Sequence, residues 1–164
     1  MTKAFAHQLK SLKHDLTTDI VFDTSDPGTG KTFVAIKAFE RRRKKKSGCA
    51  LILAPKSLLR STWAADFKKF APALKVVVAT ADVRASTFEQ DADAYVTNID
   101  AVKWLAKQPK AFFKRFETLI VDESSAYKHA TSQRSKAAAK IAAHFKYKRA
   151  MTGTPNGRSI TDVW

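Results

Sequence analysis

The segment Asp26-Pro27-Gly28-Thr29-Gly30-Lys31-Thr32 decides how the rest of the chain is interpreted. It follows a strand-like run, residues 19–24, and it opens a helix-like run. Its glycines let the backbone curl, so that consecutive N–H groups point at an anion beside the positive end of a helix. The segment therefore predicts a phosphate-binding loop, in which Lys31 reaches the β- and γ-phosphates and the Thr32 hydroxyl binds Mg²⁺. Ser25 stands where the usual pattern has its first glycine, and a helix-capping turn is the alternative.

A second segment, Thr118-Leu119-Ile120-Val121-Asp122-Glu123, is an apolar run that ends abruptly in two acidic residues. Such a run is typical of a buried parallel strand, and α/β sheets bind their ligands at the carboxyl ends of their strands. In that position Asp122 is expected to hold Mg²⁺ through water, and Glu123 to orient an attacking water molecule. The alternative is that both carboxylates simply begin a helix, because acidic side chains suit a helix N-terminus.

A third segment, Met151-Thr152-Gly153-Thr154-Pro155, follows another strand-like stretch. Hydroxyl groups beside a glycine at a strand end can sense a nucleotide through short hydrogen bonds, which makes Thr152, Gly153 and Thr154 candidates for coupling. An ordinary loop uses the same residue types.

Strand-like and helix-like segments alternate along the chain. The expected strands are residues 20–23, 50–54, 75–79, 94–97, 118–121 and 148–151, and the expected helices are residues 31–46, 57–70, 100–107 and 132–145. This alternation predicts an α/β fold with a mainly parallel central sheet and helices on both faces. A chain of 164 residues fits one domain with its own core.

Four motifs in this order resemble the first motor lobe of superfamily-two helicases and translocases, most closely the Swi/Snf-type branch. They are residues 28–32, the strand and Pro-Lys-Ser-Leu stretch within 51–59, Asp122-Glu123-Ser124-Ser125, and residues 152–155. The resemblance implies a three-layer P-loop NTPase (RecA-like) domain that uses ATP and Mg²⁺, with Lys31, Asp122 and Glu123 as catalytic residues. Ser125 stands where many relatives carry histidine.

The same resemblance implies which residues bind the nucleotide. Gln8 would be the adenine-reading glutamine, although a surface glutamine is an equal alternative on composition. The loop residues would hold the phosphates: Pro27, Gly28, Thr29, Gly30, Lys31 and Thr32. Family members continue into a second lobe that supplies an arginine finger, whereas this sequence stops at Trp164. We therefore expect residues 1–164 to form one lobe, which a second motor lobe or a partner protein completes.

The net charge is +15, from 30 Lys and Arg against 15 Asp and Glu. Such a charge attracts polyanions, and DNA is the expected partner. Lys56 and Ser57, at the start of the expected helix 57–70, suit a phosphate contact. In that helix, Ser57 is the expected N-cap, and Leu59, Trp63, Phe67 and Phe70 recur at core spacing.

Further nucleic-acid contacts are expected at Thr97, Asn98, Lys128 and Arg134, with capping of the next helix as the alternative for Asn98. The basic run 41–46 is expected at the opposite edge of the sheet from the strand carboxyl ends, as a solvated surface or a nonspecific electrostatic tether. A single cysteine and the lack of a signal-like or membrane-length apolar run predict a soluble intracellular protein without a membrane partner. Two other function classes stay open: a stand-alone nucleotide- or DNA-binding module without efficient turnover, and a small-molecule kinase.

Overall fold

A computed structural model describes residues 4–45, 48–127 and 132–153. Six strands form one parallel sheet in the order β1-β6-β5-β2-β4-β3. The strands are β1 (Ile20–Asp23), β2 (Cys49–Ala54), β3 (Val76–Ala79), β4 (Ala94–Asn98), β5 (Phe116–Val121) and β6 (Tyr147–Met151). The α-helices are α1 (Ala6–Thr17), α2 (Lys31–Lys44), α3 (Ala65–Phe70), α4 (Arg84–Glu89), α5 (Val102–Leu105), α6 (Lys110–Phe113) and α7 (Gln133–Ala142). Three further turns are the π-helical η1 (Leu59–Ala64) and the 3₁₀-helical η2 (Ile99–Ala101) and η3 (Ser124–Tyr127).

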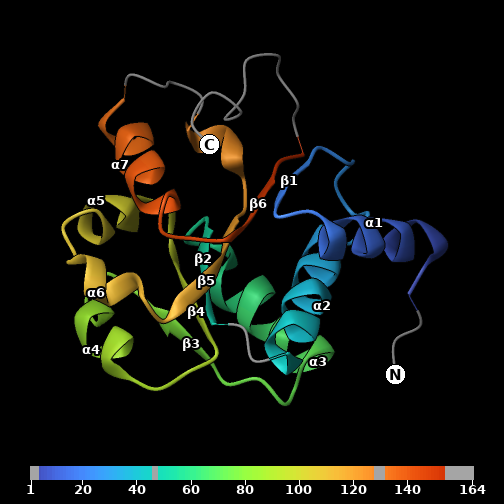
Figure 1. Ribbon diagram of the computed structural model, residues 1–164, viewed down its shortest axis with the longest axis horizontal. Coiled ribbons are helices and arrows are strands. Elements are labelled where there is room, and N and C mark those ends of the chain that lie inside the picture. Colours follow the sequence, from blue (N-terminus) through green and yellow to red (C-terminus); the bar gives the residue numbers. More distant parts are fainter. Residues whose placement is uncertain (1–3, 46–47, 128–131, 154–164) are drawn as a thin grey trace.

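Helices cover both faces of the sheet, so the predicted α/β fold is confirmed (Figure 1). Alternate residues of the central strand β2 point to opposite faces, as the period of a strand requires. Leu51 and Leu53 belong to the cluster that α4, α5, α6 and α7 cover. Ile52 and Ala54 belong to the cluster with α2, η1 and α3. Both faces are apolar, because a parallel sheet of this kind is buried on both sides.

The topology gathers the ends of three strands at one place. Strand β6 lies between β1 and β5, and the register pairs Asp23 with Met151 and Ala150 with Val121. The segments that follow β1, β6 and β5 therefore emerge side by side at the carboxyl edge of the sheet. These are the phosphate-loop segment, the Thr152-Gly153 segment and the acidic pair, respectively.

Some local predictions were wrong. Helices α1, α4 and α6 were not expected from the sequence. Ser57 does not cap a helix: η1 begins after Leu58 without a side-chain cap, and the Ser57 carbonyl accepts a hydrogen bond from the Ser61 hydroxyl. The expected continuous helix 57–70 is instead π-helical over its first part. The expected core positions Leu59, Trp63 and Phe67 are buried as predicted.

The described part of the basic run, residues 41–45, lies at the amino edge of the strands, as predicted, but it is not simply a solvated surface. Arg43 forms a salt bridge with Asp93, which directly precedes β4. Arg42 bonds the Asp15 carboxylate of α1 and stacks over the Tyr147 ring. Two members of the run therefore bind structural partners in the fold.

Candidate nucleotide-binding site

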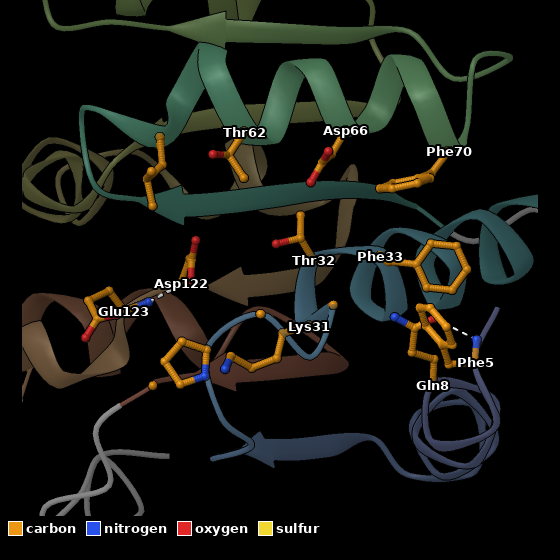
Figure 2. Close-up of a pocket in the computed structure, with 15 residues that line it drawn as sticks. Phe5, Gln8, Lys31, Thr32, Phe33, Thr62, Asp66, Phe70, Asp122 and Glu123 are labelled. Atoms are coloured by element: carbon orange, nitrogen blue, oxygen red, sulfur yellow. Dashed lines mark hydrogen bonds between the residues drawn. The ribbon is translucent and has the colours of Figure 1, made fainter. Parts of the chain in front are cut away.

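A pocket of about 520 Å³ opens at the carboxyl edge of the sheet (Figure 2). It brings together nine of the residues predicted from the sequence: Gln8, Pro27, Gly28, Gly30, Lys31, Thr32, Asp122, Glu123 and Gly153. Six further residues complete its lining: Phe5, Phe33, Leu58, Thr62, Asp66 and Phe70. Its size lies in the range of small-ligand sites.

The loop that begins this pocket has the backbone that its glycines predict. Gly28 and Gly30 have φ of 82° and 84°, values that residues with a Cβ adopt at a cost. Gly30 also directly precedes α2, so the free N–H groups of the first turn face the pocket. The Lys31 ammonium donates to the Ser25 and Asp26 carbonyl oxygens, at 2.5 and 3.1 Å. The Lys31 side chain thus lies against the phosphate loop itself, where the phosphates are predicted to bind.

Gln8 lies at one end of the pocket, and its side chain is buried rather than on the surface. The amide nitrogen donates to the Thr29 carbonyl at 3.1 Å, and the amide oxygen accepts from the Phe5 N–H at 3.0 Å. A Cβ added at Gly30 would lie 2.2 Å from the Gln8 amide nitrogen, so glutamine and loop fit closely. Thr29 contributes this carbonyl, while its side chain lines a neighbouring hollow.

The acidic pair occupies the other end. Asp122 continues β5, because its N–H donates to the Leu53 carbonyl of β2 at 2.8 Å. Burial raises the pKa of Asp122 above its ordinary value, although hydrogen bonds from the Trp63 indole and the Glu123 backbone favour the ionised form. Glu123 has a φ of 54°, a strained value for a residue with a side chain. Its carboxylate accepts a hydrogen bond from the Ser125 hydroxyl at 2.7 Å.

The donor set suits Mg²⁺. Thr32 and Asp122 line the same pocket and face one another from its two sides in Figure 2. Both offer hard oxygen atoms, the ligands that Mg²⁺ prefers. Among the described residues, no three His, Cys, Asp or Glu side chains gather to hold a metal by themselves.

The segment after β6 lies against the loop. The Thr152 N–H donates to the Asp23 carbonyl at 3.1 Å, and its side chain is buried. A Cβ on Gly153 would lie 3.0 Å from Pro27, so the two segments are in close approach. Thr154 lies outside the described residues.

Sequence reasoning missed the wall of the pocket opposite the loop. Thr62, Asp66 and Phe70 recur every fourth residue and share one side of η1 and α3. Thr62 and Asp66 were not singled out in the sequence, because the apolar spacing beside them indicated a core face. Phe70 was predicted to lie in the core, but it is half-buried and lines the pocket. Burial raises the pKa of Asp66, whereas Lys69 lowers it to a smaller extent.

The residues predicted to contact nucleic acid are placed differently from one another. Lys56 and Ser57 are exposed just beyond β2, at the same edge as the pocket. Thr97 is buried, and its hydroxyl donates to the Ala79 carbonyl at 2.7 Å, so it is not presented on the surface. Asn98 makes no side-chain cap, so the capping alternative is wrong; its oxygen accepts a hydrogen bond from Arg84 at 2.6 Å.

Arg134 lies in α7 and forms a salt bridge with Asp100 at 2.5 Å, in the turn that follows Asn98. Lys128 lies outside the described residues. Arg84 was not singled out in the sequence, yet its guanidinium lies between Asn98 and the Trp104 ring.

Comparison with solved structures places the fold among RecA-like ATPase cores. The Sulfolobus solfataricus SWI2/SNF2 ATPase core in complex with double-stranded DNA matches with a TM-score of 0.82 at 24% identity, over 99% of this chain and 35% of that one. The UvsW helicase of bacteriophage T4 matches with a TM-score of 0.74 at 16% identity, over 99% of this chain and 56% of that one.

The chain belongs to the SNF2-related domain family, whose model matches residues 9–164. An uncharacterized ATP-dependent helicase of Mycoplasma genitalium is 32% identical over 122 residues, 70% of this chain and 11% of that protein. The ATP-dependent helicase FUN30 of Saccharomyces cerevisiae is 31% identical over 148 residues, 84% of this chain and 13% of that protein. The chain thus spans only about a tenth of these relatives, and the resemblance stated from its motifs is confirmed. Over the described ranges, no helix is long and apolar enough to cross a membrane.

Proposed function

We propose that this chain is the ATP-binding lobe of a DNA-dependent ATPase, which hydrolyses ATP to act on nucleic acid when a second lobe is supplied. The observation that carries the proposal is a single pocket lined by Gln8, Lys31, Thr32 and the acidic pair Asp122-Glu123. Gln8 lies at one end of the pocket, the phosphate loop lies in the middle, and the acidic pair lies at the other end. This order matches the base, the phosphates and the metal ion of a bound nucleotide.

Each residue has a role in phosphoryl transfer to water. Lys31 leaves the loop carbonyls and donates to the β- and γ-phosphates, while the N–H groups at the start of α2 bind the phosphate oxygens. Thr32 and Asp122 would hold the Mg²⁺, which would supply positive charge to neutralise the charge that develops on the transferred group. Glu123 orients the attacking water, and the Ser125 hydroxyl fixes its carboxylate.

Efficient turnover requires a group from outside this pocket. No arginine is among the described residues that line it. An arginine finger contributes a factor of about 10³ to 10⁵ in the rate of related reactions. The net charge of +15 and the exposed Lys56-Ser57 segment favour DNA as the partner polymer. A stand-alone binding module is the second candidate, and this missing arginine favours it.

Lys31→Ala tests the proposal. We expect the affinity for a fluorescent ATP analogue to fall at least about 100-fold, because the loop loses its one phosphate-binding cation. Lys107→Ala is the matched control, since Lys107 is exposed and lies outside the pocket lining. Unchanged nucleotide affinity in Lys31→Ala would refute the assignment of the pocket.

Phosphate release, measured with and without DNA, separates the two candidates. The isolated chain is expected to hydrolyse ATP slowly. Addition of the second lobe is expected to raise the rate of hydrolysis in the presence of DNA. A rate of phosphate release that stays at the level of the isolated chain, with or without DNA and with or without the second lobe, would favour the binding module.

A further inference from the structure

The indole of Trp63 reaches from η1 to the acidic pair. Its N–H donates to the Asp122 Oδ2 at 2.9 Å, and the Glu123 N–H donates to the Asp122 Oδ1 at 3.0 Å. Each carboxylate oxygen therefore has one neutral donor. These two bonds fix the plane of the carboxylate and leave its negative charge available for a cation.

Trp63 is well suited to hold another side chain in place, because it is held itself. Its side chain is fully buried in the cluster that also contains Ile52, Leu59 and Phe67. The rings of Trp63 and Phe67 lie 6.3 Å apart between centroids. A buried indole N–H needs an acceptor, and here that acceptor is the carboxylate predicted to bind the metal.

The backbone around Trp63 is unusual. Residues 59–64 are π-helical, a conformation that is rare and is frequently found at functional sites. The same short segment carries Thr62 on the pocket wall and Trp63 in the core. It begins two residues after the exposed Lys56 and Ser57, and the Ser61 hydroxyl donates a hydrogen bond to the Ser57 carbonyl. One element thus joins the proposed nucleic-acid contact to the proposed metal ligand.

We infer that Trp63 is a positioning residue for the metal site: its indole N–H holds the Asp122 carboxylate so that the remaining lone pairs face Thr32 across the pocket. The inference rests on the proposed function, since it assigns a role to Asp122 as a metal ligand. An arginine or lysine in this place would also hold the carboxylate, but it would neutralise the charge that attracts Mg²⁺. A neutral donor orients the ligand without competing with the metal.

Trp63→Phe deletes the N–H and keeps an aromatic ring in the core. The measurement is binding of a fluorescent ATP analogue over a series of Mg²⁺ concentrations and in EDTA. We expect Trp63→Phe to need about tenfold more Mg²⁺ for half-maximal binding, the effect of losing an outer-shell partner of a metal ligand. Affinity in EDTA is expected to equal that of the unmodified chain. Trp104→Phe is the matched control, because Trp104 packs on Phe88, away from the pocket lining.

The outcomes separate the two proposals. If the unmodified chain binds no nucleotide at any Mg²⁺ concentration, the proposed function fails and the inference fails with it. If it binds with a clear Mg²⁺ dependence and Trp63→Phe keeps the same midpoint, only the inference is overturned.

A second measurement does not depend on the folding of the variant. In the ¹⁵N-labelled unmodified chain, the indole N–H resonance of Trp63 is expected to move when Mg²⁺ is added to the nucleotide complex. The resonance of Trp104 is expected to stay in place. A Trp63 resonance that ignores Mg²⁺ while nucleotide binding responds to it would overturn the inference.

Discussion

Two carboxylates at the same edge of the sheet have opposite surroundings. Asp23, at the end of β1, bonds the buried guanidinium of Arg149 and accepts hydrogen bonds from the Ser25 N–H and hydroxyl. Asp122, just beyond β5, bonds only the neutral N–H groups of Trp63 and Glu123 among the hydrogen bonds that the structure gives it. One carboxylate has a cation from the protein, whereas the other is hydrogen-bonded but not neutralised.

The difference indicates which carboxylate serves the fold and which serves the ligand. Arg149 also bonds Asp15 of α1, so this cluster joins β6, β1 and α1 into one unit beneath the loop. Burial alone raises the pKa of Asp23, but the Ser25 hydrogen bonds and the charges of Arg149 and Lys31 lower it overall. For Asp122 the balance is reversed, and burial raises its pKa. The charge of Asp122 is therefore a cost to the folded chain until a cation binds.

Arg149→Met should have the largest effect on stability. Arg149 is only 3% exposed, and its removal leaves the half-buried Asp23 without a salt bridge and the buried Asp15 with Arg42 alone. We expect the free energy of unfolding to fall by about 3–5 kcal/mol, and the Tm to fall by about 10 °C. Thermal unfolding followed by circular dichroism measures this.

The matched control is Arg43→Met, which removes a more exposed ion pair with Asp93 and should cost less than about 1 kcal/mol. Adding Asp23→Asn to Arg149→Met should restore part of the loss, because the carboxylate that lost its salt bridge is then neutral, while Asp15 keeps its salt bridge with Arg42. A similar cost for Arg149→Met and Arg43→Met would contradict the structural role assigned to the cluster.

Asp122→Asn should cost far less stability than Arg149→Met. It removes a buried charge that forms no salt bridge, which is favourable, but the amide NH₂ then faces one of the two N–H donors and one hydrogen bond is lost. Each effect is about 1 kcal/mol, so we expect the Tm at neutral pH to change by less than about 4 °C. The Mg²⁺-dependent part of nucleotide affinity should fall by about 100-fold, since the metal loses a ligand. Thermal unfolding and binding of the fluorescent analogue measure the two effects on one sample. A variant that is as unstable as Arg149→Met and still binds with the normal Mg²⁺ dependence would remove the contrast between the two carboxylates.

The sequence predicted the sheet and the convergence of the motifs, because both follow from local patterns. Each strand is a short apolar run, and parallel strands bring their carboxyl ends to one edge, so the loop and the acidic pair were expected to meet. The cluster of Arg149, Asp15 and Asp23 could not be predicted in this way. Arg149 and Asp15 are 134 positions apart, and α1, which carries Asp15, was not expected to be a helix. A charged residue within a strand-like segment does not indicate which residue of opposite charge it will pair with.

The role of Trp63 was hidden for a different reason. Its spacing with Leu59 and Phe67 predicted a core residue, and the side chain is buried as expected. The apolar pattern describes the ring but not the direction of its one polar atom. That direction depends on the π-helical turn of η1, which helical periodicity alone does not distinguish from an α-helix.

Ser25→Ala tests the contrast most finely, through the pH dependence of stability. The Ser25 hydroxyl donates to Asp23 at 2.6 Å and helps to lower the pKa of that carboxylate. A lowered folded-state pKa contributes stability that is present above the ordinary value of 3.8 and is lost as the pH falls through the folded-state pKa. We therefore expect Ser25→Ala to be less stable than the unmodified chain by about 0.5–1 kcal/mol near neutral pH, with the difference closing as the pH falls below 3.8. Tm values measured at several pH values check this. A gap that stays constant into acid would mean that the hydroxyl stabilises the loop through its contact with Thr29 instead of through the charge of Asp23.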